Sequence, residues 1–249
     1  MTRVPRANPS RKHRSNPAWI QRHLGDPYVK AATQAGYRSR AAYKLIEIDD
    51  KDRLLRPGLT VVDLGAAPGS WTQVVRERLR DRAGRFRGRI VALDLLPVEP
   101  LPDVTIVAGD FREEAVEKAL ATTLGSPTVD LVLSDMAPNL SGIAAVDAAA
   151  SSLLAELALE FACAHLGSEG ALLVKAFQGS GYTQLVERLK AAFQSVASRK
   201  PPASRAESAE TYLLARRLRP QSRTRPGAGP GSAAGGKEPK DHAGSDGGA

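Results

Sequence analysis

Cysteine and histidine are scarce in this chain of 249 residues. Cys163 is the single cysteine, so a disulfide within the chain and a Cys-rich metal site are both excluded. The histidines form no HxH or HxxxH pair, a spacing that can bring two ligands onto one metal ion. They are His13, His23, His165 and His242. We therefore expect a protein of a reducing compartment whose chemistry needs no metal.

Long apolar runs are lacking as well. No run reaches about 18 apolar residues, the length that a membrane-spanning helix needs. The charged N-terminus is not followed by the apolar segment of a secretory signal, and Pro5, Pro9 and Pro17 interrupt the amphipathic helix of an organelle transit peptide. The sequence thus favours a cytoplasmic protein that is not inserted in a membrane.

Each end of the chain lacks one class of residue. Residues 1–18 contain five Arg or Lys and no acid, while residues 219–249 contain eight Gly and no Val, Ile, Leu, Met, Phe, Trp or Tyr. Because neither segment can bury a core, we predict a basic flexible arm (1–18), one folded domain (19–218) and a disordered tail rich in Gly, Pro and Ala (219–249). The arm's charge of +5 suits RNA, although a solubilising tail would have the same composition.

Short apolar segments alternate with helical patterns from residue 60 onward. The segments rich in Val, Ile and Leu predict five buried strands, TVVDLG, RIVALDLL, VTIVAGD, VDLVLSDM and ALLVKAFQ, with helices over 70–82, 112–124, 144–166 and 182–193. SVASRK and TYLLARRL follow with no helix between them and should pair antiparallel at the end of the sheet. A helix over 39–53, capped by Ser39, precedes the sheet. The prediction is an α/β fold with a mostly parallel seven-stranded sheet flanked by helices.

Polar residues at the ends of three strands point to a nucleoside. In open α/β sheets ligands bind at the carboxyl ends of the strands. The first strand runs into GAAPGSW, whose small residues allow close backbone approach and whose helix presents unpaired N–H groups. Asp94 ends the second strand, where it can accept hydrogen bonds from ribose hydroxyls, and Asp110 follows the third, where it can meet an adenine amino group. Tight packing alone explains one glycine-rich turn but not this set.

Other nucleotide cofactors fit less well. GAAPGS departs from the GxGxxG of dinucleotide-binding turns, and the sequence has no GxxxxGK[ST]. NAD, FAD and a P-loop nucleotide are therefore disfavoured, and S-adenosylmethionine is the predicted cofactor. Asp135 ends the fourth strand, and Lys175 lies inside the apolar fifth. Most strand lysines reach water at an edge, so a functional role for Lys175 requires partners.

Seven segments of this chain match one known family in their order along the sequence. They are DPYVKAATQAGYRSRAAYKL, VVDLGAAPGSW, DLLP, GDFREE, LSDMAPNLSG, LLVKAFQGSGY and SRKPPASRAESAETYLL. Over residues 19–218 the sequence closely resembles the FtsJ-type 2′-O-methyltransferases, particularly bacterial members that act on 23S ribosomal RNA. The resemblance implies a Rossmann-like class I fold and S-adenosylmethionine-dependent methylation of a ribose 2′-hydroxyl. It further implies a uridine of 23S rRNA within the large ribosomal subunit as the substrate.

The same resemblance implies a set of site residues. The catalytic group would be Lys44, Asp135, Lys175 and Glu210, and the cofactor would be bound by Gly69, Trp71, Asp94, Asp110 and Asp135. The chain departs from some members at Ser70, where they have Gly, and at Glu207, where they have Arg. Since Glu207 is a second nearby carboxylate, the assignment of Glu210 rests on its register with the TYLL strand.

The predicted reaction gives these residues different roles. A ribose hydroxyl needs a base to take its proton, and Lys175 can do so only as a neutral amine, a form that burial and the neighbouring cation Lys44 favour. Asp135 and Glu210 are better suited to orienting the lysine and the hydroxyl. Arg38 and Arg40 of GYRSR are phosphate-binding candidates. The seven arginines between residues 76 and 89 are equally well explained as a solvated helix face and loop.

Two other classes of function remain open on the sequence alone. The same catalytic group occurs in relatives that methylate a tRNA anticodon-loop ribose or an mRNA cap. A non-catalytic RNA-binding or assembly factor could retain the fold, but the complete Lys, Asp, Lys and Glu set argues against it. We expect a monomer that binds the large ribosomal subunit and requires neither metal nor membrane.

Overall fold

The computed structural model describes residues 25–125, 128–139, 141–206 and 208–223. The predicted basic arm and nearly all of the predicted tail lie outside these residues. Within them, no helix is both long and apolar enough to cross a bilayer.

Seven strands form one sheet in the order β3-β2-β1-β4-β5-β7-β6. β1 to β5 run parallel, while β7 lies antiparallel between β5 and β6. The predicted parallel sheet with an antiparallel pair at its end is confirmed. The strands are β1 (Thr60–Leu64), β2 (Arg89–Asp94), β3 (Val104–Ala108), β4 (Val129–Ser134), β5 (Leu166–Phe177), β6 (Phe193–Arg199) and β7 (Glu210–Leu218).

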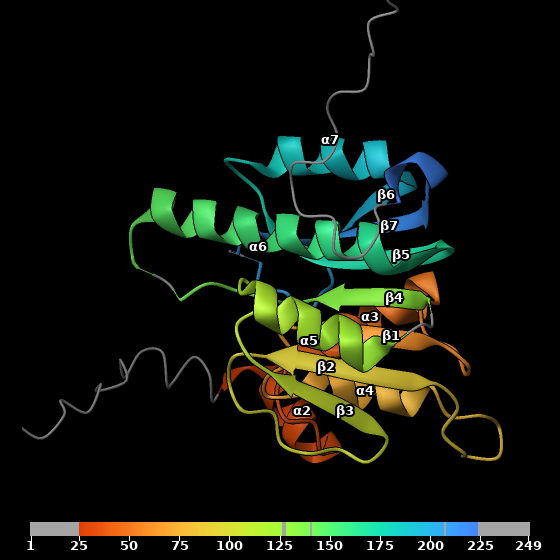
Figure 1. Cartoon of the computed structure of the whole chain (residues 1–249). Helices are drawn as coiled ribbons and strands as arrows, with labels where there is room; N and C mark the ends of the chain where they lie inside the picture. The colour runs from red at the N-terminus through yellow and green to blue at the C-terminus, as the bar shows by residue number, and fades with distance from the viewer. Residues whose placement is uncertain (1–24, 126–127, 140, 207, 224–249) are drawn as a thin grey trace, which may run out of the picture.

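Helices cover both faces of the sheet (Figure 1). α5, α6 and α7 pack on one face over a core that includes Val62, Leu93 and Leu172. α3 and α4 pack on the other, over a core that includes Val61 and Leu173. The bounds are α2 (Pro27–Ala35), α3 (Ala41–Asp52), α4 (Ser70–Arg78), α5 (Glu114–Leu124), α6 (Ala144–His165), α7 (Tyr182–Ala192) and the 3₁₀ turn η1 (Pro220–Ser222). Neighbouring strand residues face opposite layers because strand side chains alternate.

α2 is a helix that the sequence analysis missed. It begins after Asp26, whose side chain accepts a hydrogen bond from the Tyr28 N–H at 3.0 Å, and Pro27 occupies its first position. It ends at Gly36, which has a φ of 77°. Asp before Pro at the start, and Gly just after the end, are the signals that mark a helix of this length.

Some predicted helices start or end at other residues in the structure, and α5 begins at Glu114 rather than at residue 112. α3 begins at Ala41 rather than Ser39, although the Ser39 hydroxyl accepts a hydrogen bond from the Ala41 N–H at 3.2 Å. α4 ends at Arg78, four residues earlier than predicted. Beyond it, the Asp81 carboxylate accepts hydrogen bonds from the Ala83 and Arg85 N–H groups and stabilises a turn instead.

Six of the seven arginines between residues 76 and 89 contact groups of this same chain. Arg76 pairs with Asp103, Arg78 with Asp50, and both Arg85 and Arg87 with Asp81. Arg80 donates to the Gly84 carbonyl and Arg89 to the Leu124 carbonyl. These contacts agree with a solvated helix face and loop.

Candidate functional site

The carboxyl ends of the parallel strands meet at one edge of the sheet. Leu64 at the end of β1 is in register with Leu93 of β2 and Ser134 of β4, and Ser134 is in register with Val174 of β5. The residues that follow these positions are therefore close in space. They include the glycine-rich turn, Asp94, Asp135 and Lys175.

A cavity of about 430 Å³ opens at this edge. Three carboxylates from different strand ends line it, Asp94, Asp110 and Asp135, as the sequence predicted for the cofactor site. Its apolar lining includes Leu95, Leu96 and Leu153, whose exposed fractions are 57%, 62% and 48%. Such exposure suits side chains that a bound ligand covers.

The glycine-rich turn closes tightly against two neighbouring strands. The N–H groups of Gly65 and Ala66 both donate to the Leu93 carbonyl, at 2.9 and 3.1 Å. A side chain at Gly65, where φ is 79°, would lie 2.7 Å from Cγ of Met136, which follows β4. Gly65 therefore lets the turn approach the end of β4 and leaves the cavity open between them.

Asp94 joins the turn to the end of β2. Its Oδ2 accepts a hydrogen bond from the Ala67 N–H at 2.8 Å, and its Oδ1 accepts one from the Leu96 N–H at 2.7 Å. Asp110 instead pairs with the Arg112 guanidinium, whose hydrogen bonds hold the pKa of that carboxyl below its usual range. Both carboxylates are thus fixed in place at the cavity wall.

Gly69 lies against Arg38, which precedes α3, and Trp71 contacts the first residue of α3. A side chain at Gly69, where φ is 105°, would collide with the guanidinium of Arg38. The Trp71 ring is 2% exposed, its indole N–H donates to the Ala41 carbonyl at 2.8 Å, and it packs on Tyr212 with ring centroids 5.5 Å apart. The Trp71 side chain therefore joins α4 to α3 and β7.

The four predicted catalytic residues come together as two ion pairs. Lys44 of α3 lies 2.7 and 2.9 Å from the two oxygens of Glu210, the first residue of β7. Lys175 of β5 lies 2.9 Å from Oδ1 of Asp135 and donates to the Asp135 carbonyl at 2.8 Å. The Lys175 side chain is only 8% exposed, so its ammonium is stabilised almost entirely by protein groups.

Tyr212 links the two pairs and was not predicted from the sequence. Its hydroxyl donates to Oδ1 of Asp135 at 2.7 Å and accepts from the Lys44 ammonium at 3.3 Å. Tyr212 stands opposite Lys175 in the register of β5 and β7. Because it is two residues after Glu210 in one strand, it shares that residue's face, which is the signal that could have revealed it.

The charges at this edge set the protonation of its acids. Burial alone would raise the pKa of Asp135, but the Lys175 and Lys44 ammonium groups outweigh it and hold that pKa below the usual range. Asp63, at the buried end of β1, has its pKa raised to about 7 by burial, with Asp135 and Asp94 adding to the rise. Asp135 is therefore a charged carboxylate at the cavity wall, balanced by the lysines beside it.

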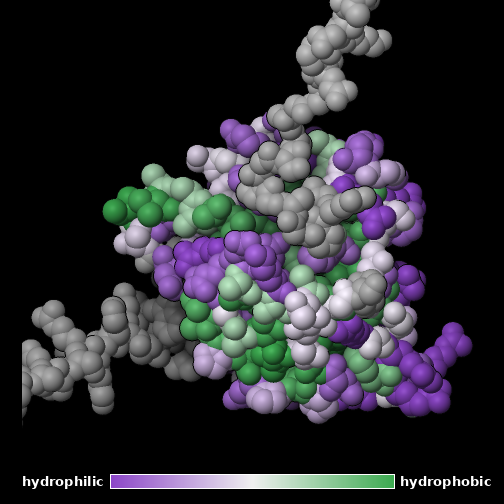
Figure 2. Space-filling view, viewed as in Figure 1, coloured by the Kyte–Doolittle hydropathy of each residue, from purple (hydrophilic) through white to green (hydrophobic). Residues whose placement is uncertain are grey.

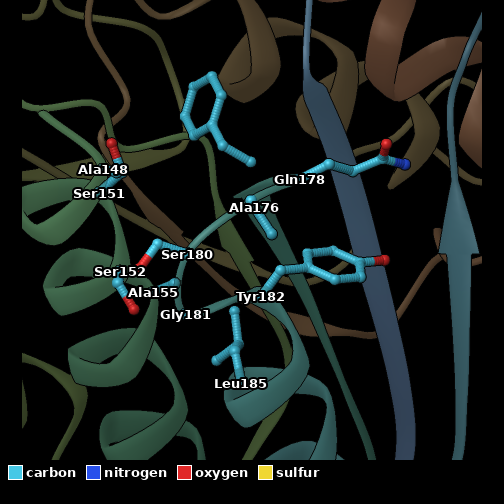
Figure 3. A pocket seen from close by; sticks show the side chains of 12 residues that line it. Ala148, Ser151, Ser152, Ala155, Ala176, Gln178, Ser180, Gly181, Tyr182 and Leu185 are labelled. Carbon is cyan, nitrogen blue, oxygen red and sulfur yellow. The ribbon is translucent and has the colours of Figure 1, made fainter. Parts of the chain in front are cut away.

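A second cavity, between α6 and the start of α7, is too small to hold a nucleoside. Its volume is about 40 Å³, and its lining includes Ser152, Gly181, Tyr182 and Leu185 (Figure 3). This is room for about one to three waters. The larger cavity, beside the two ion pairs, is the candidate functional site.

Comparison with known proteins identifies the family. The FtsJ-like methyltransferase family matches residues 37–218. This chain belongs to it. The chain is 57% identical over 216 residues to the "Ribosomal RNA large subunit methyltransferase E" of Cupriavidus taiwanensis, covering 84% of this chain and 98% of that protein. The same name is carried by a Bordetella parapertussis protein, 57% identical over 208 residues and covering 84% and 99%.

A solved structure supports the same assignment. The crystal structure of a ribosomal RNA methyltransferase from Plasmodium falciparum matches with a TM-score of 0.63 at 32% identity, over 73% of this chain and 98% of that one. The chain is therefore an enzyme with the Rossmann-like fold of the FtsJ-like methyltransferases, as the sequence predicted.

The predicted phosphate-binding arginines of this methyltransferase have protein partners. Arg38 donates to the carbonyls of Pro68, Glu99 and Pro100. Arg40 pairs with Asp26 at 2.7 Å and donates to the Ala203 carbonyl. Of the two candidate carboxylates, Glu210 contacts Lys44, whereas Glu207 lies outside the described residues.

Hydrophobic surface adjoins the site at the start of α6 (Figure 2). Ile143 and Val146 are exposed there, at 61% and 52%.

Among the described residues, no three His, Cys, Asp or Glu side chains gather as metal ligands would.

Proposed function

We propose that this methyltransferase transfers a methyl group from S-adenosylmethionine to a ribose 2′-hydroxyl of large-subunit ribosomal RNA, at a uridine of 23S rRNA. The observation that carries the proposal is the buried Lys175–Asp135 pair at the wall of a cavity lined by three carboxylates. The names of the relatives support the choice of RNA. This substrate would place the enzyme where ribosomes are made, in the cytoplasm.

The residues of the cavity fit this cofactor. Asp94 and Asp110 could accept hydrogen bonds from ribose hydroxyls and an adenine amino group, and Leu95, Leu96 and Leu153 could cover the base. The charged carboxylate of Asp135 at the cavity wall could interact with a cationic ligand. When bound, the sulfonium would supply a methyl group that is already activated, so methyl transfer needs no metal.

The protein groups then prepare the hydroxyl. In its neutral amine form, after its extra proton has left to solvent, Lys175 would accept the proton from the 2′-oxygen as that oxygen takes the methyl group, and Asp135 holds the lysine nitrogen at 2.9 Å. Lys44 is paired with Glu210 and orients the substrate through Tyr212 and Asp135.

Calorimetry tests the cofactor assignment. Asp94→Ala should weaken S-adenosylmethionine binding by about 10- to 100-fold, because a charged acceptor is lost and the Ala67 and Leu96 N–H groups lose their partner. Glu114→Ala, which removes a surface carboxylate of α5, is the matched control and should bind normally. NAD should not bind. Equal affinity of wild type and Asp94→Ala would remove Asp94 from the site.

The basic arm gives a separate prediction. Deleting residues 1–18 should lower RNA affinity and make that affinity less dependent on salt. The arm carries a charge of +5, and its binding to RNA phosphates displaces the counterions condensed on the RNA. Cofactor affinity should not change, and deleting 219–249 should have a smaller effect. RNA binding measured across a series of salt concentrations decides the matter, since an unchanged slope would leave the arm only a solubilising role.

A methylation assay on defined RNAs separates the alternatives. Purified large subunits that lack the modification should accept one methyl group on a 2′-oxygen, whereas tRNA should accept none. Transfer to tRNA alone would favour the second substrate class, and cofactor binding with transfer to no RNA would favour an assembly factor.

A further inference from the structure

Two side chains, one from α3 and one from its N-cap, hold the loop between β6 and β7 through hydrogen bonds to Ala203. The Ala203 N–H donates to Oε2 of Glu47 at 2.7 Å, and the Ala203 carbonyl accepts from the Arg40 guanidinium. Ala203 is fully buried. Both backbone groups of this residue are thus fixed by side chains of one helix and its N-cap.

Residues at the start of α2 support the two gripping side chains. The Tyr28 hydroxyl donates to the other Glu47 oxygen at 2.8 Å, and Asp26 pairs with Arg40 at 2.7 Å. The Arg40 side chain is 16% exposed, and its Nε is buried. Arg40 therefore has little surface left for a phosphate in solvent.

The next residue in the loop reaches the catalytic group. The Ser204 hydroxyl donates to Oε1 of Glu210 at 2.9 Å, the same oxygen that lies 2.7 Å from the Lys44 ammonium. Ser204 is 6% exposed, and its N–H donates to the Pro201 carbonyl at 2.8 Å. The backbone N–H of Ser204 is thus bonded within the loop, and its side-chain hydroxyl is the group that contacts Glu210.

We propose that Ser204 is a positioning residue, which orients Glu210 against Lys44, and that Arg40 and Glu47 set the place of Ser204 by gripping Ala203. The proposal deepens the proposed function and rests on it for its effect on turnover. A carboxylate that receives a neutral donor and an ammonium on one oxygen has a fixed rotation about its last bond. That fixes Lys44, which in turn contacts the Tyr212 hydroxyl beside Asp135.

Removing the hydroxyl should reduce turnover without reducing binding. Ser204→Ala is expected to lower kcat about tenfold, the size of one hydrogen bond to a charged group. KM for cofactor and for the large subunit should stay within about twofold, since Ser204 is not among the residues that line the cavity and its hydroxyl is bonded to Glu210. Ser198→Ala is the matched control, because that hydroxyl bonds Thr211 rather than Glu210 and its loss should leave kcat unchanged.

A double-mutant cycle separates positioning from general stability. In a Glu210→Gln background, Ser204→Ala should cause little further loss of kcat, because the serine acts through that carboxylate. Equal losses in both backgrounds, or a wild-type kcat for Ser204→Ala, would overturn the proposal. Thermal unfolding of all four proteins shows whether any variant has simply lost its fold.

Arg40 distinguishes a grip on the loop from a phosphate contact. Arg40→Gln should lower kcat like Ser204→Ala and leave the salt dependence of RNA binding unchanged. A salt slope reduced by about one phosphate contact, with normal kcat, would make Arg40 an RNA ligand and the grip interpretation wrong.

A spectroscopic measurement tests Ser204 without any RNA. The ammonium signal of Lys44 in protein labelled with ¹⁵N-lysine should be visible in wild type and in Ser198→Ala, because Glu210 and Tyr212 slow its hydrogen exchange. It should broaden or vanish in Ser204→Ala, and an unaffected signal would contradict the proposal. If the wild-type protein methylated no RNA, the proposed function would be wrong. The Lys44 ammonium signal would still show whether Ser204 positions Glu210 against Lys44.

Discussion

Replacing Lys175 by Ala is expected to lower turnover by about 10² to 10⁴-fold while cofactor and RNA still bind. Lys175 contacts the Asp135 carboxylate at the cavity wall, and its loss removes the group that acts on the proton in the transition state. The effect should therefore appear in kcat and not in the dissociation constants. Single-turnover methylation of large subunits, together with calorimetry, measures both.

Three comparisons control this result. Lys175→Arg should also be inactive, because a guanidinium stays protonated and cannot accept the proton. Lys118→Ala, which removes a surface lysine of α5, should be as active as wild type. A large subunit with 2′-deoxyribose at the target position should accept no methyl group, because it lacks the 2′-oxygen. Turnover of Lys175→Ala within a fewfold of wild type would move the base assignment to Asp135 or to solvent.

Asp135→Asn is expected to lower turnover by about 10²-fold or more and also to weaken cofactor binding. Asp135 lines the cavity and pairs with Lys175, so its charge serves both. The Asn side chain keeps the shape of the carboxylate and loses only the charge. Calorimetry and kcat should therefore both change, in contrast to Lys175→Ala. Unchanged cofactor affinity would show that Asp135 does not face the bound cation.

The same substitution has a predicted effect on acid stability. The pKa of Asp135 is held below its usual range in the fold by Lys175 and Lys44. Its contribution to the free energy of unfolding is thus present above the unfolded value of about 3.9 and is lost as pH falls through the lower folded value. Asp135→Asn should therefore be less stable than wild type near neutral pH, and the difference should shrink in acid.

The central strands of the sheet were predictable because they are buried on both faces. Runs such as VVDL and LVLS are buried at every position and consist mostly of Val and Leu, and the helices between them require parallel strands. α2 and the end of α4 were not predicted correctly, because local side-chain hydrogen bonds from Asp26 and Asp81 decide them. Such bonds leave no periodic pattern in the sequence.

The rule that ligands bind at the carboxyl ends of parallel strands correctly predicted that Asp94, Asp110 and Asp135 would lie together. It could not predict which lysine forms an ion pair with which carboxylate. Glu210 lies against Lys44 and Asp135 against Lys175, a division set by contacts between α3, β5 and β7 that are far apart along the chain. The partners of Arg38 and Arg40 have the same origin. An arginine near a catalytic helix looks the same in sequence whether it binds phosphate or a backbone carbonyl.

The most direct test of the central claim is a map of 2′-O-methylated riboses in total RNA from cells with and without this gene. We predict the loss of one mark, at a uridine of 23S rRNA, and its return when the wild-type protein is supplied but not when Lys175→Ala is supplied. An unchanged 23S map together with a lost tRNA mark would contradict the claim.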